Sequence, residues 1–132
     1  MLNMESKIRE AVDKKISGKY NCAQAVACSY ADVVQSDEDA LYNAAAAFGA
    51  GMGCMEGTCG AIVGAGIVLG LKYKDKARAM KALKQVLLAF KQRNGCTICK
   101  QLKGLETKKV VRECNDCVAD AAEFLENVLT AE

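Results

Sequence analysis

The sequence lacks histidine, proline and tryptophan, and it holds few aromatic residues. Without histidine there can be no Cys-His nucleophilic pair, no histidine-ligated haem and no zinc site of mixed cysteine and histidine ligands. The absence of proline, the many alanines and an aromatic share of only 5% favour helices over strands. We therefore predict an all-α fold.

Long hydrophobic runs are absent as well. The longest run, residues 59–71, has about 13 residues, whereas a membrane-spanning helix needs roughly 20. The N-terminal residues carry charges throughout and lack the apolar segment of a secretory signal. We therefore expect a cytoplasmic protein that does not interact with a membrane and whose thiols stay reduced.

Nothing in the sequence divides the chain, because no repeat, low-complexity tract or linker is found in its 132 residues. We expect a single helical, cysteine-rich domain, residues 1–132, built as a bundle of about five to six helices with a Gly/Cys-rich loop. The expected helices cover residues 6–16, 22 onward, 37–48, 59–71, 74–92 and 116–129, with a short helical piece at 96–104.

Two of these helices are expected to begin at a cysteine. Asn21 is a good N-cap and Gln24 completes a capping-box pattern, so Cys22 takes the first helical position. Thr58 is expected to cap the glycine-rich helix in the same way, which puts Cys59 first. Cysteine at a helix start is therefore a recurring feature.

Glycine spacing and apolar spacing predict how two of the helices pack. Two glycine pairs, Gly60/Gly64 and Gly66/Gly70, are each four residues apart and are expected to line faces that another backbone approaches closely. In the helix at 74–92 the expected core face consists of Ala77, Met80, Leu83, Leu87 and Phe90.

Helix N-termini offer unpaired N–H groups and about half a positive charge, which lower the pKa of a cysteine thiol placed there. Cys96 and the Cys114/Cys117 pair are also expected at or just before such ends. The thiolate is the form that attacks a disulfide or binds a metal. Nearby glycines would allow a cofactor or a partner thiol to come close to the sulfur.

Two CxxC motifs have the spacing of a tetrathiolate zinc site, formed by Cys96, Cys99, Cys114 and Cys117. The segment between them holds no clear hairpin, which argues against a zinc ribbon. Soft thiolate sets also bind copper(I) or iron–sulfur clusters, and a CxxC can instead cycle between dithiol and disulfide. Cys28 lies within an apolar helix face and is expected to be a small buried hydrophobe.

Four segments resemble the C_GCAxxG_C_C family of redox-active proteins: YNCAQAV, TCGAIVGAGIVLGLKY, CKQLKG and CNDCVADAAEFL. They follow the order of the family over residues 19–129. The resemblance implies that the redox thiols, or the metal ligands, are Cys22, Cys59, Cys99 and Cys114. It implies further that a cofactor would be bordered by Gly60, Ala61 and Gly64.

We expect these four cysteines to converge on one site, because each is expected at a helix start. Four thiolates could hold an iron–sulfur cluster, or two pairs could form reversible disulfides. The glycine-rich segment leaves room for a cluster next to these cysteines, and this favours a cluster over disulfides. The predicted function is thus that of a redox protein, either an electron carrier or a thiol oxidoreductase. The alternative is a binding module with structural zinc held by the two CxxC motifs.

Residues 72–112 contain 13 lysines or arginines, and their only acids are Asp75 and Glu106. Most of these charges belong on solvated helix faces, but a basic face could also dock an acidic redox partner, or an anionic partner of the zinc module. Nucleic-acid binding is not expected, because interleaved aromatics and known modules are lacking. Apolar stripes and glycine faces lead us to expect a homodimer.

Overall fold

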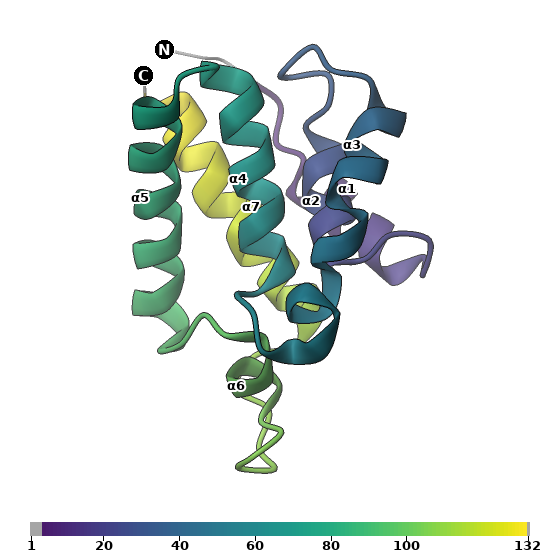
Figure 1. The fold of residues 1–132 in the computed structure, drawn as a ribbon, viewed down its shortest axis with the longest axis vertical. Helices are drawn as coiled ribbons and strands as arrows, with labels where there is room; N and C mark the ends of the chain where they lie inside the picture. Colours follow the sequence, from purple (N-terminus) through teal and green to yellow (C-terminus); the bar gives the residue numbers. More distant parts are fainter. Residues whose placement is uncertain (1–3, 132) are drawn as a thin grey trace.

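The computed structural model describes residues 4–131, which contain seven α-helices and no β-strand (Figure 1). The all-α class expected from composition is confirmed, and α6, a separate helix of only five residues, brings the number just above the predicted five to six. The helices are α1 Ile8–Ile16, α2 Cys22–Ser29, α3 Glu38–Ala45, α4 Gly60–Tyr73, α5 Lys76–Asn94, α6 Cys99–Lys103 and α7 Cys114–Thr130; two short turns, η1 Ala46–Phe48 and η2 Gly51–Met55, lie before α4.

Helix α4 lies at the centre of the bundle, where α2, α5 and α7 all pack against it. Helix α1 packs on α2 and α7, and α3 packs on α2. The core between these helices contains fully buried side chains such as Val26, Val68, Phe90 and Leu125. In Figure 1, α6 and the loop that follows it project below the lower end of the bundle, where α4 and α7 begin.

The start of α2 is as predicted. The side chain of Asn21 accepts a hydrogen bond from the N–H of Gln24, and the Gln24 side chain accepts one from the N–H of Asn21. This capping box satisfies two N–H groups that a helix end would leave unpaired, so Cys22 is the first helical residue.

The predicted start of α4 is wrong by one residue. Cys59, not Thr58, is the N-cap, and Gly60 is the first helical residue. The reason is that the pairing around the bridge between Thr58 and Ile98 includes Cys59: its N–H donates to the carbonyl oxygen of Thr97, and its ψ of 128° is not helical. A propensity for capping was overridden here by pairing with a segment far along the chain.

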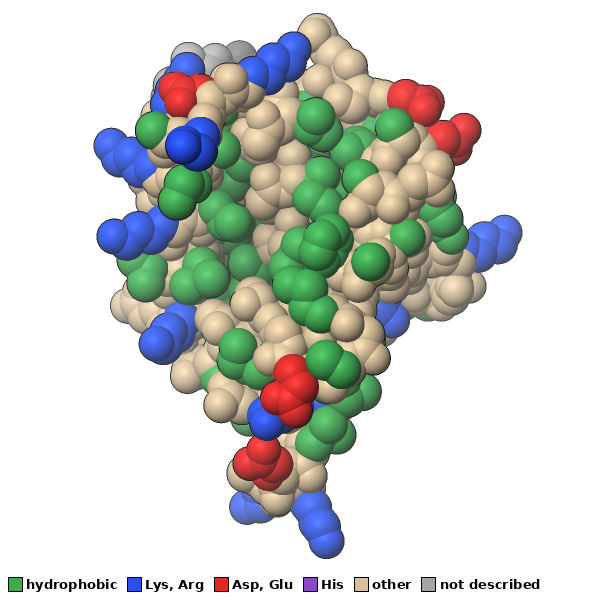
Figure 2. Space-filling view, in the orientation of Figure 1, with side chains coloured by type: hydrophobic (Ala, Val, Ile, Leu, Met, Phe, Trp, Pro, Cys, Tyr) green, Lys and Arg blue, Asp and Glu red, His purple; other side chains and the backbone are tan. Residues whose placement is uncertain are grey.

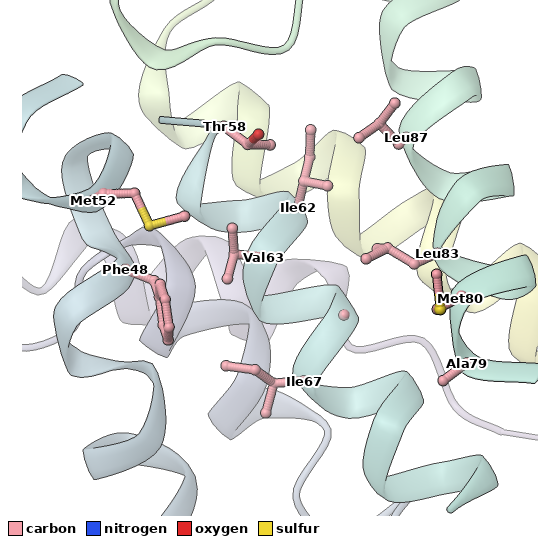
Figure 3. A pocket seen from close by; sticks show the side chains of 11 residues that line it. Phe48, Met52, Thr58, Ile62, Val63, Ile67, Ala79, Met80, Leu83 and Leu87 are labelled. Carbon is pink, nitrogen blue, oxygen red and sulfur yellow. The ribbon is translucent and has the colours of Figure 1, made fainter. Parts of the chain in front are cut away.

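The core face of α5 is also rotated from the predicted one. Ala82, Val86 and Phe90 are buried, whereas Met80 is 66% exposed. Of the predicted stripe only Phe90 belongs fully to the core, because α5 packs against α4 and α7 together. Met80 and Leu83 instead form one wall of an open apolar groove of about 430 Å³ between α4 and α5 (Figure 3).

The glycines of α4 differ in what they face. A Cβ at Gly64 would lie 2.5 Å from the carbonyl oxygen of Ala23, so this glycine allows α2 and α4 to approach closely, as expected. Gly66 faces the side chain of Leu83 rather than a backbone, and Gly70 has nothing within 4 Å. Close backbone approach is therefore correct for the first glycine pair and wrong for the second.

On the face shown in Figure 2, lysines and arginines gather along the α5 edge. Apolar side chains line the groove between α4 and α5 on the same face. No helix in residues 4–131 has the length and apolar character needed to cross a membrane.

Candidate functional site

Five cysteines line one small cavity at the end of the bundle where α2, α4, α6 and α7 begin; they are Cys22, Cys59, Cys99, Cys114 and Cys117. The cavity has a volume of about 10 Å³, which is room for about one water molecule. The structure thus brings together the four cysteines that we expected to share a site, and it adds Cys117. Their role as redox thiols stays a prediction.

The starts of α4 and α6 are tied to each other by two backbone hydrogen bonds. The N–H of Cys59 donates to the carbonyl oxygen of Thr97 at 2.7 Å, and the N–H of Cys99 donates to that of Gly57 at 2.9 Å. These bonds flank the bridge between the two segments and hold both cysteines at the cavity.

Two glycines leave space that cysteine side chains fill. A Cβ at Gly60 would overlap the Sγ atom of Cys22 and lie 2.7 Å from the carbonyl oxygen of Phe48. A Cβ at Gly51 would lie 2.5 Å from the Cβ of Cys99. The room that we expected the glycine-rich segment to leave for a cluster is therefore occupied by the cysteines themselves.

Of the three residues expected to border a cofactor, only Gly60 lines the cavity. Ala61 is fully buried in the core, and Gly64 contacts α2. A role for these residues in binding a cofactor remains a prediction.

The first pair of facing sulfurs is Cys22 and Cys114. The hydrogen bond that the Cys114 thiol donates to the Cys22 sulfur lowers the pKa of Cys22 to about 6, against the opposing effect of burial. The backbone N–H groups of Ala50 and Ala23 lower this pKa further. The same hydrogen bond, together with burial, raises the pKa of Cys114, so the pair holds one thiolate and one thiol.

The second pair is Cys59 and Cys117. The hydrogen bond from the Cys117 thiol lowers the pKa of Cys59, although burial and the nearby Cys22 act in the opposite direction. The first N–H groups of α4 add to the lowering, as expected for the positive end of a helix. The pKa of Cys117 is raised by the hydrogen bond to Cys59 and by burial.

Cys99 differs from these four cysteines. It lies in the cavity wall, but within residues 4–131 no hydrogen bond joins its sulfur to another sulfur. Burial raises the pKa of its thiol, and Lys103 only partly opposes this. Cys99 is therefore a neutral thiol beside the two pairs.

Accessibility distinguishes the two pairs. Cys22, Cys59 and Cys117 are 4%, 5% and 2% exposed, whereas Cys114 is only partly buried. Cys114 is thus the sulfur of the paired four that another molecule reaches most readily.

A buried carboxylate holds the chain on both sides of α6. Asp120 is 2% exposed and accepts two hydrogen bonds from Arg112, both at 2.9 Å, one from Arg93 at 2.9 Å and one from Asn94 at 3.1 Å. Burial alone would raise the pKa of Asp120, but these hydrogen bonds lower it. The carbonyl oxygen of Arg112 lies 3.9 Å from the Sγ atom of Cys117, so this network reaches the cavity.

Sequence reasoning missed both Asp120 and the membership of Cys117 in the four-cysteine site. A signal existed for each. Asp120 is an acid on the apolar stripe of α7, between Cys117 and Phe124 at helical spacing. Cys114 and Cys117 are three residues apart, which puts both side chains on one helix face.

The remaining cysteines lie outside the cavity. Cys28 is buried, as expected, and burial raises its pKa to about 11. Cys54 is exposed. Cys96 was expected at a helix start, but Cys99 begins α6 instead, and the thiol of Cys96 donates to the carbonyl oxygen of Asn94 at 3.9 Å.

A metal site needs several donor side chains that converge on one point. The proposed zinc set is not gathered in one cavity, because Cys96 does not line it with the other three cysteines. Within the described part of the chain, no three Cys, Asp or Glu side chains are arranged to hold a metal ion. An iron–sulfur cluster is larger than one water molecule, so this cavity does not fit one. Zinc and a cluster remain predictions from the sequence, and the observed arrangement fits disulfide chemistry better.

One comparison with known proteins gives a match. The family model described as "Putative redox-active protein (C_GCAxxG_C_C)" matches residues 20–128. No curated protein and no solved structure shows significant similarity to the chain. The matched range contains every cysteine of the cavity.

Proposed function

The chain belongs to the C_GCAxxG_C_C family, and we propose that it transfers electrons by thiol–disulfide exchange through Cys22 and Cys114. The observation that carries the proposal is that these two cysteines line one small cavity and that Cys114 is the partly accessible member. The lowered pKa of Cys22 supports it, because the thiolate is the reactive form. The description of the family as redox-active supports the same chemistry.

In the oxidised protein, Cys22 and Cys114 are joined by a disulfide bond. A thiolate of a partner dithiol attacks the Sγ atom of Cys114, because this sulfur is the more accessible of the two. A mixed disulfide forms, the bond between Cys22 and Cys114 breaks, and Cys22 leaves as a thiolate. The low pKa of Cys22 makes it a good leaving group.

The second thiolate of the partner then attacks the partner sulfur of the mixed disulfide. This step closes a disulfide in the partner and releases Cys114, which takes up a proton. Two electrons pass from the partner to the pair; of the two partner protons, one goes to Cys114 and one to solvent. Since the thiolate of Cys22 stabilises the reduced form, the pair should act as an oxidant of dithiols.

The proposed partner is an acidic redox protein. Lys103 lines the cavity beside Cys114, and its charge would attract a negatively charged surface. Such an association weakens as salt concentration rises, because the charges are screened.

The proposal is tested by equilibrating the protein with glutathione redox buffers and identifying disulfides by alkylation and mass spectrometry. We expect a bond between Cys22 and Cys114, and its loss in the variants Cys22→Ser and Cys114→Ser. The variant Cys54→Ser, which removes an exposed cysteine outside the cavity, should behave as wild type.

The absence of a disulfide between Cys22 and Cys114 in the wild-type protein, in the most oxidising of these buffers, would overturn the proposal. Stoichiometric zinc, or iron with sulfide, in protein purified without oxygen would do so as well, since the thiolates would then be metal ligands.

A further inference from the structure

The exchange proposed above leaves Cys59 and Cys117 without a function, although they form a facing pair like the first one. Their side chains are only 5% and 2% exposed, so a folded protein partner cannot reach either sulfur. Inert buried cysteines are usually neutral, as Cys28 is here, where burial raises the pKa of the thiol to about 11. A buried pair of cysteines that lines the same cavity as an accessible cysteine is therefore unusual.

The two pairs adjoin each other in the same cavity. Cys114 and Cys117 come from successive turns of α7 and both line it, which brings one sulfur of each pair to one helix face. On the opposite side, the missing side chain of Gly60 lets the sulfur of Cys22 lie against the first turn of α4, next to Cys59. The cavity that the two pairs line together has room for only about one water molecule.

We propose that Cys59 and Cys117 form a second redox pair that exchanges electrons only with Cys22 and Cys114 inside the protein. This inference rests on the proposed function of the first pair. It gives one chain the capacity to hold two electron pairs, one at the accessible disulfide and one in the interior.

The first step of the internal transfer starts from an oxidised outer pair and a reduced inner pair. Cys117 passes its proton to Cys59 along their hydrogen bond and becomes a thiolate. It attacks the Sγ atom of Cys114, a disulfide forms between Cys114 and Cys117, the bond to Cys22 breaks, and Cys22 leaves as a thiolate.

In the second step, Cys59 loses its proton and attacks the Sγ atom of Cys117. A disulfide forms between Cys59 and Cys117, the bond between Cys114 and Cys117 breaks, and Cys114 leaves and takes up the proton that Cys59 lost. Two electrons have moved from the inner pair to the outer pair, and the number of protons on the four sulfurs is unchanged. The step needs no further oxidant or reductant.

The experiment oxidises the fully reduced protein with oxidised glutathione, stops samples by alkylation over time, and identifies each disulfide by mass spectrometry. In wild type we expect the disulfide between Cys22 and Cys114 first and that between Cys59 and Cys117 later. In Cys114→Ser the second disulfide should form at least about tenfold more slowly, because its route through the accessible sulfur is removed. Cys54→Ser serves as the matched control and should keep the wild-type rates.

A second variant guards against effects on folding. Cys59→Ala should halve the number of disulfides formed per chain, and the disulfide that remains should join Cys22 and Cys114. Circular dichroism checks that Cys114→Ser and Cys59→Ala remain helical, and Cys114→Ala replaces a variant that does not fold.

The outcomes separate the two proposals. If Cys59 and Cys117 oxidise as fast in the Cys114 variants as in wild type, or never oxidise in wild type while the outer pair does, the inner-pair proposal is overturned and the proposed function stands. If the outer pair itself fails to form a disulfide in wild type, both proposals are overturned.

Discussion

Cys114 donates the hydrogen bond that keeps Cys22 ionised, so a single proton held between two sulfurs lowers one pKa and raises the other. The donor comes from the start of α7 and the acceptor from the start of α2, which are 92 residues apart in the chain but meet at the same end of the bundle. The reactivity of Cys22 therefore depends on a side chain distant from it in sequence.

Removing this donor should make Cys22 a weaker acid. In the reduced wild-type protein we expect one thiolate to form with a pKa of about 6. Ultraviolet absorbance of the thiolate, or the pH dependence of alkylation, measures this pKa. In Cys114→Ala the titration of Cys22 should move toward its ordinary value of 9.0, because the hydrogen bond to the thiolate is lost. Removing Cys28, which lies outside the cavity, should leave the titration in place, and an unmoved titration in Cys114→Ala would contradict the assignment.

The stability of the reduced protein should depend on pH between about 6 and 9. The folded state lowers the pKa of Cys22 from 9.0 to about 6, so its contribution to the free energy of unfolding is full above 9 and is lost as pH falls to 6. Cys114 has the opposite sign, because its raised pKa means a contribution present below pH 9 and lost above it.

Denaturant unfolding over this pH range measures the effect. In Cys22→Ala the rise of stability between pH 6 and 9 should be markedly smaller than in wild type. An equal rise in both proteins would show that other groups cause it.

Asp120 should be essential for the stability of the site. The variant Asp120→Asn removes the charge of a buried carboxylate that accepts hydrogen bonds from two partly exposed guanidinium groups, and losing a hydrogen bond to a charged group costs about 1.5–3 kcal/mol. Glu123→Gln is the matched control, since it removes a carboxylate that also binds Arg93 but is exposed, and it should cost no more than about 1 kcal/mol. Chemical denaturation gives both values, and similar costs for the two variants would refute the role of Asp120.

Two glycines of α4 should respond in opposite directions to alanine. Gly60→Ala puts a Cβ onto the sulfur of Cys22 and close to the carbonyl oxygen of Phe48, so both stability and thiol pairing should suffer. Gly70→Ala meets nothing within 4 Å and should stabilise the helix by about 0.5–1 kcal/mol. Thermal melting with disulfide mapping compares them; equal effects would argue against close packing at Gly60.

The face that α5 buries, which differs from the predicted one, leads to a further prediction about stability. Phe90→Ala should cost about 3–5 kcal/mol, because the ring is fully buried. Met80→Ala should change the free energy of unfolding by no more than about 0.5 kcal/mol, because its side chain lines the groove and is mostly exposed. A large loss of stability in Met80→Ala, measured on dilute monomeric protein, would mean that another part of the chain covers the groove.

Local rules predicted most of the helices. The capping box at Asn21 depends only on neighbouring residues and is found. The expected range 37–48 corresponds to α3 and η1, the range 74–92 to α5, and the range 116–129 lies within α7.

What depends on distant segments was not predictable in the same way. Thr58 has a good capping side chain but pairs with Ile98, and the face that α5 buries is decided by where α4 and α7 lie. The pairing of sulfurs also needed the fold, because helical spacing tells that Cys114 and Cys117 share a face but not that each meets a different cysteine.

The placement of the cysteines has a consequence for how the chain folds. The cavity combines segments near residues 22, 59 and 114, so it is complete only after α7 has docked against α2 and α4, which lie far from it in the chain. Until then the eight thiols are exposed to one another with no geometry to select partners. Refolding the chain in reducing solution and oxidising it afterwards should therefore yield a single set of disulfides, whereas oxidation during refolding should trap scrambled isomers.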